Sequence, residues 1–200
     1  REEDDRFLWK PNHRSPKSLF SSADIWLALH PIGNRVDWHK AVWFKNHIPK
    51  HAFICWVSAW NRLHTRDRLR RWGLNIPSSC VLCNSCDETR DHLFLDCHFS
   101  SQVWRFFISA SGLYPPFSFK DSLLWVRSPS PDKNISFILK ILFQVVIYFT
   151  WKERNARIHS ATFRSCAQVI KDIQLTVWAL LDPLSRLQHQ KSPGPSLLAS

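Results

Sequence analysis

Methionine is absent from this 200-residue chain, and glycine is scarce, with four residues. The scarcity of glycine excludes collagen-like and low-complexity proteins. Because methionine is absent and residue 1 is arginine, we interpret the chain as a fragment of a longer protein. The N-terminus has no apolar stretch, which argues against a signal peptide. Acidic residues are also few: 16 Asp and Glu stand against 27 Lys and Arg, so the net charge is +11.

Long hydrophobic runs are missing as well. The best candidate, residues 135–151, contains Lys140 and Gln144, and it falls short of the roughly 20 mostly apolar residues that a membrane span needs. We therefore expect a buried helix there. The hydrophobic content of 44% and charged content of 22% fit a soluble globular chain. Without a secretion signal we expect an intracellular, reducing compartment, where cysteines are metal ligands or buried thiols.

The spacing of apolar residues and the positions of capping residues predict a mostly α-helical fold. We expect helices over about 22–29, 49–61, 66–72, 100–110 and 123–126, and a long pair over about 134–159 and 165–181. Thr65 is the expected cap of the helix 66–72 and Asn134 that of the helix 134–159. Asp182 and Pro183 are expected to end the last helix. The tryptophans at 43, 56 and 104 are expected in the core.

The helix 49–61 carries apolar side chains at helical spacing. Phe53, Trp56, Val57 and Trp60 lie at i, i+3, i+4 and i+7. This pattern predicts that they form the buried stripe of an amphipathic helix.

Four of the six cysteines lie within 18 residues. Cys80, Cys83, His92 and Cys97 form a Cys₃His set with the spacing Cys-x2-Cys-x8-His-x4-Cys. Structural zinc prefers such a closed set of four ligands, and soft thiolates argue against Mg²⁺ or Ca²⁺. The spacing therefore predicts one structural Zn²⁺.

The choice of ligands leaves alternatives open. Cys86 could replace Cys83 or His92, and His98 could replace Cys97. Cys55 and Cys166 lie far away in the sequence and are expected to be buried apolar side chains. Glu88 and Asp91 are expected on the solvated face of a short helix that leads into His92.

Many residues around the cysteines resemble a known family, the zinc-binding domain of plant reverse transcriptases of the LINE (non-LTR retrotransposon) type. The matching elements appear in order over roughly 18–110: Trp38-x4-Trp43, Ile48-Pro49-Lys50, Phe53-x2-Trp56, Arg62-Leu63-x-Thr65-x-Asp67-x-Leu69-x2-Trp72-Gly73, Cys80-x2-Cys83, Glu88-Thr89-x2-His92-Leu93-Phe94-x2-Cys97 and Val103-Trp104. The segment 151–155 also looks like the one that follows the domain in these proteins. The resemblance implies that Cys80, Cys83, His92 and Cys97 are the ligands, and that Cys86 is an extra thiol.

The resemblance also implies partners and a location. It implies RNA or DNA of a retroelement, an upstream polymerase domain, a downstream ribonuclease H domain in the parent chain, and a nuclear address. From the resemblance and the composition along the sequence we expect five parts. They are a polar extended arm (1–17), the zinc-binding domain (18–112), a Pro/Ser linker with a short helix (113–133), a helical hairpin (134–183) and a disordered tail (184–200).

Positive charge is concentrated beside the predicted zinc site. Residues 35–72 hold nine Lys or Arg against two Asp. Basic side chains neutralise phosphates, so a nucleic-acid-binding face is predicted here. Its candidate residues are Arg62, Arg66, Arg68, Arg70 and Arg71. A second candidate patch consists of Lys152, Arg154, Arg157 and Arg164.

Two functions are consistent with these patterns. The first is a non-catalytic zinc-binding accessory module of a retroelement reverse transcriptase that contacts RNA or DNA through its basic face. The alternative is a zinc-stapled protein-interaction domain or an inactive retrotransposon-derived relic. An enzyme is not expected, because neither the paired aspartates of a polymerase in a strand context nor the converging carboxylates of a ribonuclease H are recognisable.

Overall fold

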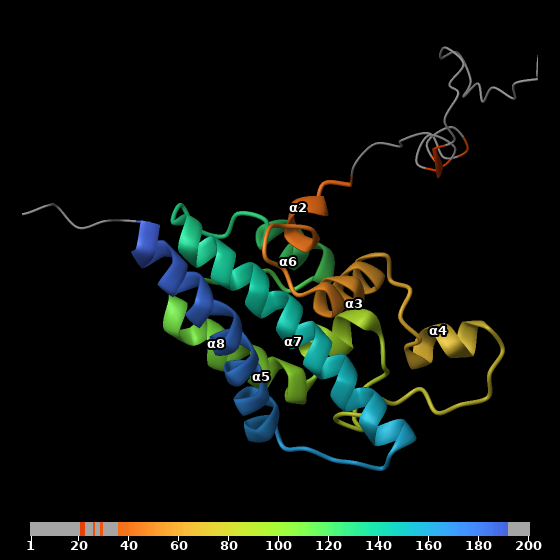
Figure 1. Ribbon diagram of the computed structural model, residues 1–200. Coiled ribbons are helices and arrows are strands. Elements are labelled where there is room, and N and C mark those ends of the chain that lie inside the picture. The colour runs from red at the N-terminus through yellow and green to blue at the C-terminus, as the bar shows by residue number, and fades with distance from the viewer. Residues whose placement is uncertain (1–20, 23–25, 27–28, 30–35, 192–200) are drawn as a thin grey trace, which may run out of the picture. The chain divides into compact units, whose positions relative to one another are not determined.

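Residues 21, 22, 26, 29 and 36–191 are described by the computed structural model shown in Figure 1. Most of the helix predicted at 22–29 lies outside these residues. From Asp37 onward the described residues belong to one compact unit. Its elements are α2 (His39–Val42), α3 (Pro49–Ala59), α4 (Arg66–Arg71), η1 (His92–Asp96), α5 (His98–Ile108), η2 (Ser109–Ser111), α6 (Phe119–Trp125), α7 (Lys133–His159) and α8 (Cys166–Lys191).

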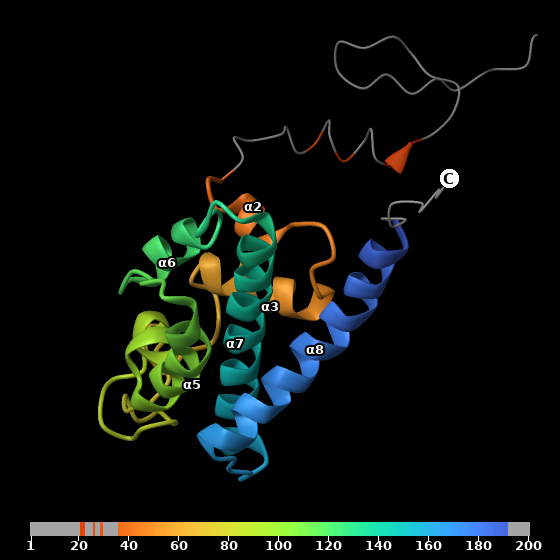
Figure 2. The same ribbon diagram turned by 90° about the vertical axis from the view of Figure 1, so that its left-hand side faces the viewer.

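The described part of the chain contains helices and no strand, which confirms the predicted mostly α-helical class. An isolated antiparallel β-bridge joins the backbones of Ser79 and Asp87 in this part. The predicted hairpin forms, because α7 and α8 pack against each other. Figures 1 and 2 show α7 in the middle of this unit, with α3, α5 and α8 arranged around it.

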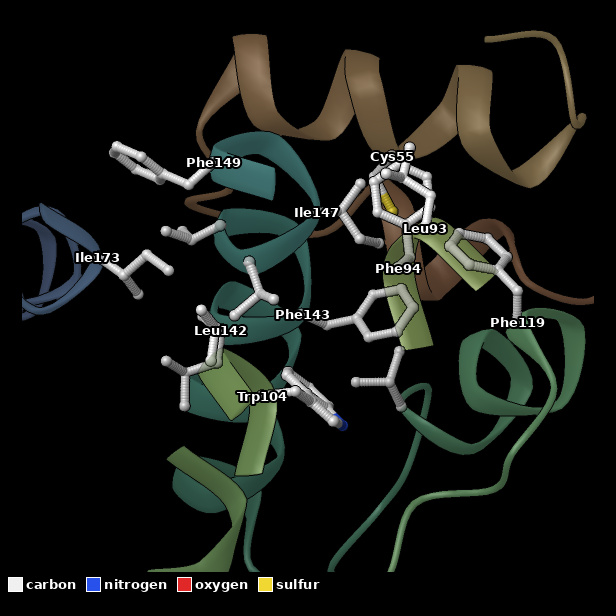
Figure 3. Close-up of a cluster of buried hydrophobic side chains, with 14 of the residues drawn as sticks. Cys55, Leu93, Phe94, Trp104, Phe119, Leu142, Phe143, Ile147, Phe149 and Ile173 are labelled. Carbon is white, nitrogen blue, oxygen red and sulfur yellow. The ribbon is translucent and has the colours of Figure 1, made fainter. Parts of the chain in front are cut away.

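Helix α7 supplies the centre of the core. By length and composition it could cross a membrane, but 61% of its apolar window is buried inside the protein, as expected for a core helix. Figure 3 shows Phe143 of α7 beside Trp104 of α5 and Phe119 of α6. The ring centroids of Trp104 and Phe143 lie 5.9 Å apart, as do those of Phe119 and Phe143. Residues from widely separated parts of the sequence therefore share one core.

A buried amide attaches α7 to the start of this unit. The Gln144 side chain is buried, and its Nε2 donates to the backbone carbonyls of Ala41 at 3.3 Å and Val42 at 2.7 Å. These carbonyls lie at the C-terminal end of α2, where intrahelical donors are missing. The bond thus satisfies helix-end groups that are removed from water.

The predicted buried stripe of α3 is correct for Trp56 and Val57, which are half-buried and pack against the core, and wrong for its two ends. Phe53 and Trp60 are exposed by 53% and 46%, whereas His51, Ala52 and Cys55 are buried. Helix α3 is apolar around most of its circumference, so spacing alone does not select the face. His51 faces α7, where its ring lies 4.2 Å from that of Tyr148 and 6.1 Å from that of Phe149, centroid to centroid. The expectation that Cys55 is a buried apolar side chain is confirmed.

The tryptophans expected in the core lie there or against it. Trp104 is buried, and Trp43 and Trp56 are half-buried and pack against the core.

Two expected helix boundaries also differ from the structure. Asp132, not Asn134, caps α7, and its carboxylate accepts from the backbone N–H groups of Asn134 and Ile135 at 2.7 and 3.1 Å. Helix α8 does not end at Pro183 but continues through it to Lys191. A proline removes one helical hydrogen bond, and an ion pair between Arg186 and Asp182, at 3.0 Å, spans the site.

Candidate metal centre

The four residues predicted as zinc ligands converge at one point. The ligand atoms of Cys80, Cys83, His92 and Cys97 all lie within 4.8 Å of one another. The Sγ atoms of Cys80 and Cys97 are 3.9 Å apart, and Cys83 Sγ lies 3.3 Å from His92 Nε2. Tetrahedral zinc with Zn–S bonds of about 2.3 Å and Zn–N bonds of about 2.0–2.1 Å requires ligand separations of about 3.5–3.8 Å. The donor set and its dimensions therefore fit one Zn²⁺.

The first two ligands are positioned by a tight loop, residues 80–84, which we call the metal loop. The backbone N–H of Asn84 donates to the carbonyl of Cys80 at 2.8 Å, and the N–H of Cys80 donates to the carbonyl of Cys86 at 2.7 Å. Asn84 has a positive φ of 56°, a conformation that Asn tolerates better than most residues. These bonds turn the chain back on itself, so that both thiols point inward.

The last two ligands flank a π-helical turn. The N–H of Cys97 donates to the carbonyl of His92, five residues earlier, at 2.7 Å. In an α-helix of 3.6 residues per turn, positions five apart would point about 140° away from each other. The wider π turn brings His92 and Cys97 to the same side. Such turns occur frequently at functional sites.

The two buried thiols of the cluster already share a hydrogen bond. The bond with Cys97, together with burial, raises the pKa of the Cys80 thiol. The same bond lowers the pKa of Cys97. A divalent cation would take the place of the shared proton and bind both sulfurs as thiolates. Four protein ligands leave no open coordination position, which is the arrangement of a structural zinc site.

The structure resolves the alternative ligands. Cys86 and His98 are exposed and are not part of the cluster. The sequence left them open because their spacing is also compatible with a turn. The backbone decides, since the N–H of Cys80 bonds to the carbonyl of Cys86 and thereby points the Cys86 thiol toward solvent.

The expectation that Glu88 lies on a solvated face is wrong. Its side chain is completely buried and forms an ion pair with Arg154 of α7, with Nη2 and Oε1 2.8 Å apart. The same oxygen accepts the backbone N–H of Arg66 at 3.0 Å, and Oε2 accepts that of Val81 at 3.3 Å. Glu88 therefore caps α4 in place of the expected Thr65 side chain, and it binds the metal loop. Asp91 is half-buried and pairs with Arg90 at 2.7 Å.

The second predicted basic patch is not a free surface. Arg154 is 4% exposed and paired with Glu88. Arg157 and Arg164 both pair with the buried carboxylate of Glu153, each at 2.9 Å. Lys152 is the exposed member of the set. Three of the four basic residues are therefore paired with buried carboxylates. The sequence pattern does not reveal these ion pairs.

The arginines of the first predicted basic face fall into two groups. Arg66 and Arg68 are half-buried, and each donates to a backbone carbonyl, that of Ser79 and of Asn61 respectively. Arg62, Arg70 and Arg71 are exposed. The Arg71 guanidinium pairs with Asp67 one turn earlier. The exposed group presents its charge to solvent, and within it Arg70 also donates to the carbonyl of Ile76 and Arg71 to that of Asp67, both at 3.3 Å.

A comparison with protein families matches residues 20–104 to the family described as zinc-binding in reverse transcriptase. The match includes the four ligands and ends inside α5. No curated protein and no solved structure matches the chain.

Proposed function

From the membership of residues 20–104 in the zinc-binding family of reverse transcriptases, we propose that this chain is a non-catalytic accessory module that holds the RNA or DNA of a retroelement. One observation carries the proposal: an exposed surface of α4 and the residues around it combines cations and aromatic rings, and α4 is bonded through Arg66 to Ser79, the residue before the metal loop. We call this surface, formed by Trp60, Arg62, Arg70, Arg71 and Trp72, the α4 surface.

The aromatic side chains of the α4 surface are partly exposed, although each already has a ring contact, Trp60 with Trp38 and Trp72 with His64. Trp60 is 46% and Trp72 is 55% exposed. Arg68 links them, because it donates to the carbonyl of Asn61 next to Trp60 and lies over the Trp72 ring, with its Cζ 5.1 Å from the centroid. Stacking of a base on an aromatic side chain contributes about 1–3 kcal/mol and tolerates any sequence.

The metal centre has a structural role in this proposal. Zinc fixes the metal loop, and Arg66 donates from α4 to the carbonyl of Ser79, directly before the first ligand. The position of α4 therefore depends on the loop. The buried carboxylates of this unit, Glu88 and Glu153, are occupied by arginines and are not available as general bases.

Salt-dependent binding to a fluorescent single-stranded oligonucleotide tests the proposal. Changing Arg62, Arg70 and Arg71 together to Gln should weaken binding and reduce the slope of log K against log salt by about 2, since each phosphate contact contributes about 0.7 for a single strand. The matched control changes three exposed lysines outside the α4 surface, Lys120, Lys133 and Lys171, to Gln. It removes the same charge.

An equal loss of affinity and slope in the control would contradict the assignment of the α4 surface. Trp72→Ala provides a second arm. It should lower affinity for a single strand by about 5- to 150-fold, the equivalent of one stacked base, and it should leave duplex binding nearly unchanged. Arg66 and Arg68 are not used for this test, because they are half-buried and hold α4 to Ser79 and Asn61.

A further inference from the structure

The metal loop is held from a distant part of the chain. Arg157, in the last turns of α7, donates through Nη1 to the carbonyls of Val81 and Leu82, at 3.4 and 3.0 Å. These two carbonyls lie between the first two ligands, Cys80 and Cys83. Arg157 follows the family-matched segment by more than 50 residues.

One of the peptide planes held by Arg157 faces the Cys80 sulfur. In a trans peptide the C=O of one residue and the N–H of the next point in opposite directions within one rigid plane. Fixing the carbonyl of Val81 therefore aims the N–H of Leu82, which lies 3.4 Å from Cys80 Sγ. The second bond, to the carbonyl of Leu82, fixes the next peptide, which leads into the ligand Cys83.

Arg157 is itself rigidly supported. Its Nε pairs with Glu153, and its Nη2 donates to the carbonyl of Arg164 at 3.3 Å. Its guanidinium lies against the Phe99 ring, with Cζ 4.9 Å from the centroid, and its side chain is only 11% exposed. Glu153 also accepts the backbone N–H of Arg164 at 2.9 Å, and Arg164 pairs with Asp172 of α8 at 2.6 Å. The support thus extends through both helices of the hairpin.

We propose that Arg157 is a positioning residue of the metal centre, which fixes the metal-loop peptides so that the N–H of Leu82 donates to the Cys80 thiolate. Three thiolates and a neutral imidazole around Zn²⁺ carry one net negative charge, which the guanidinium complements. Partners of metal ligands commonly change metal affinity by about 10- to 100-fold when they are removed. The proposal concerns metal binding alone and does not depend on nucleic-acid binding.

Zinc affinity measured by competition with a chromophoric chelator tests this role. Arg157→Gln should raise the zinc dissociation constant by about 10-fold or more and should shift the d–d absorption of the Co²⁺-loaded chain. Arg157→Lys should recover part of the affinity, because an ammonium reaches one carbonyl but lacks the planar fork. The matched control is Lys152→Gln, an exposed cation on the same helix. A lower melting temperature with a zinc affinity within twofold of the wild type would overturn the proposal.

A second measurement uses the unaltered chain, in case Arg157→Gln does not fold. Hydrogen exchange is compared with zinc bound and after chelation. Removal of zinc should increase exchange in the metal loop and in the last two turns of α7, and it should leave residues 139–147 of the same helix protected. Unchanged exchange at the end of α7, while the metal loop loses protection, would show that Arg157 is not coupled to the metal centre.

Discussion

Arg154→Met is the sharpest test of how the zinc-binding segment and α7 are joined. Arg154 is 4% exposed and its partner Glu88 is fully buried, so neither charge is stabilised by water. Removing one partner of such a pair costs about 3–5 kcal/mol, because an uncompensated charge stays buried. The backbone N–H groups of Arg66 and Val81 remain bonded to Glu88, but both bonds from the guanidinium are lost. For a domain of this size, we expect a decrease in melting temperature of about 6–20 °C.

The assay is urea unfolding with saturating zinc, so that metal loss does not enter the comparison. The double variant Glu88→Gln/Arg154→Met should be less destabilised than the sum of the single variants, because the remaining buried charge is gone. Arg186→Met is the control. Its pair with Asp182 is exposed, with the arginine side chain 74% accessible, and exposed pairs contribute about 0–1 kcal/mol. A cost of less than about 1 kcal/mol for Arg154→Met would refute the reasoning, because it falls in the range of an exposed pair.

Three further outcomes are expected. Cys80→Ser or Cys97→Ser should abolish zinc binding, measured by elemental analysis, and should expose the metal loop to proteolysis, since such sites supply about 10–16 kcal/mol of apparent folding free energy. Cys86→Ser should retain the zinc. Burial, with a smaller contribution from Lys50, lowers the pKa of His51 from 6.5 to about 4. The unfolded chain therefore binds an additional proton between these values, and stability should fall by up to about 3 kcal/mol as the pH decreases through this window. His51→Phe should remove that loss in urea titrations at each pH, and parallel curves for both chains would contradict the assignment. A fragment that ends at residue 104 should give the circular dichroism of an unfolded or aggregated chain, because Trp104 loses its packing partner Phe143; a cooperative melt of that fragment would disprove this.

Local spacing made the metal ligands predictable. Cys80 and Cys83 are brought together by one turn, and His92 and Cys97 by the next, so the separation in sequence nearly determines the separation in space. The helices over 49–61 and 134–159 were predictable as elements, since helix formation depends on residues within one segment, although the cap of α7 and part of the buried face of α3 were assigned wrongly.

Contacts between distant segments were not predictable from the sequence. Glu88 and Arg154 are 66 residues apart, and an acidic residue in a polar stretch shows no sign of burial. Phe53 and Trp60 were wrongly assigned to the buried face of α3, because the helix is apolar around most of its circumference and spacing alone does not select the face. The proposed domain boundaries and the nucleic-acid role of the α4 surface stay predictions.

The π turn at His92–Asp96 has a consequence for insertions and deletions. The interval from His92 to Cys97 has a fixed length, because a single hydrogen bond across five residues sets the direction of both side chains. Loss or gain of one residue there would rotate Cys97 by about 100° relative to His92. Among related sequences, a copy with an altered interval should therefore have lost its zinc, even where all four ligand residues are still present.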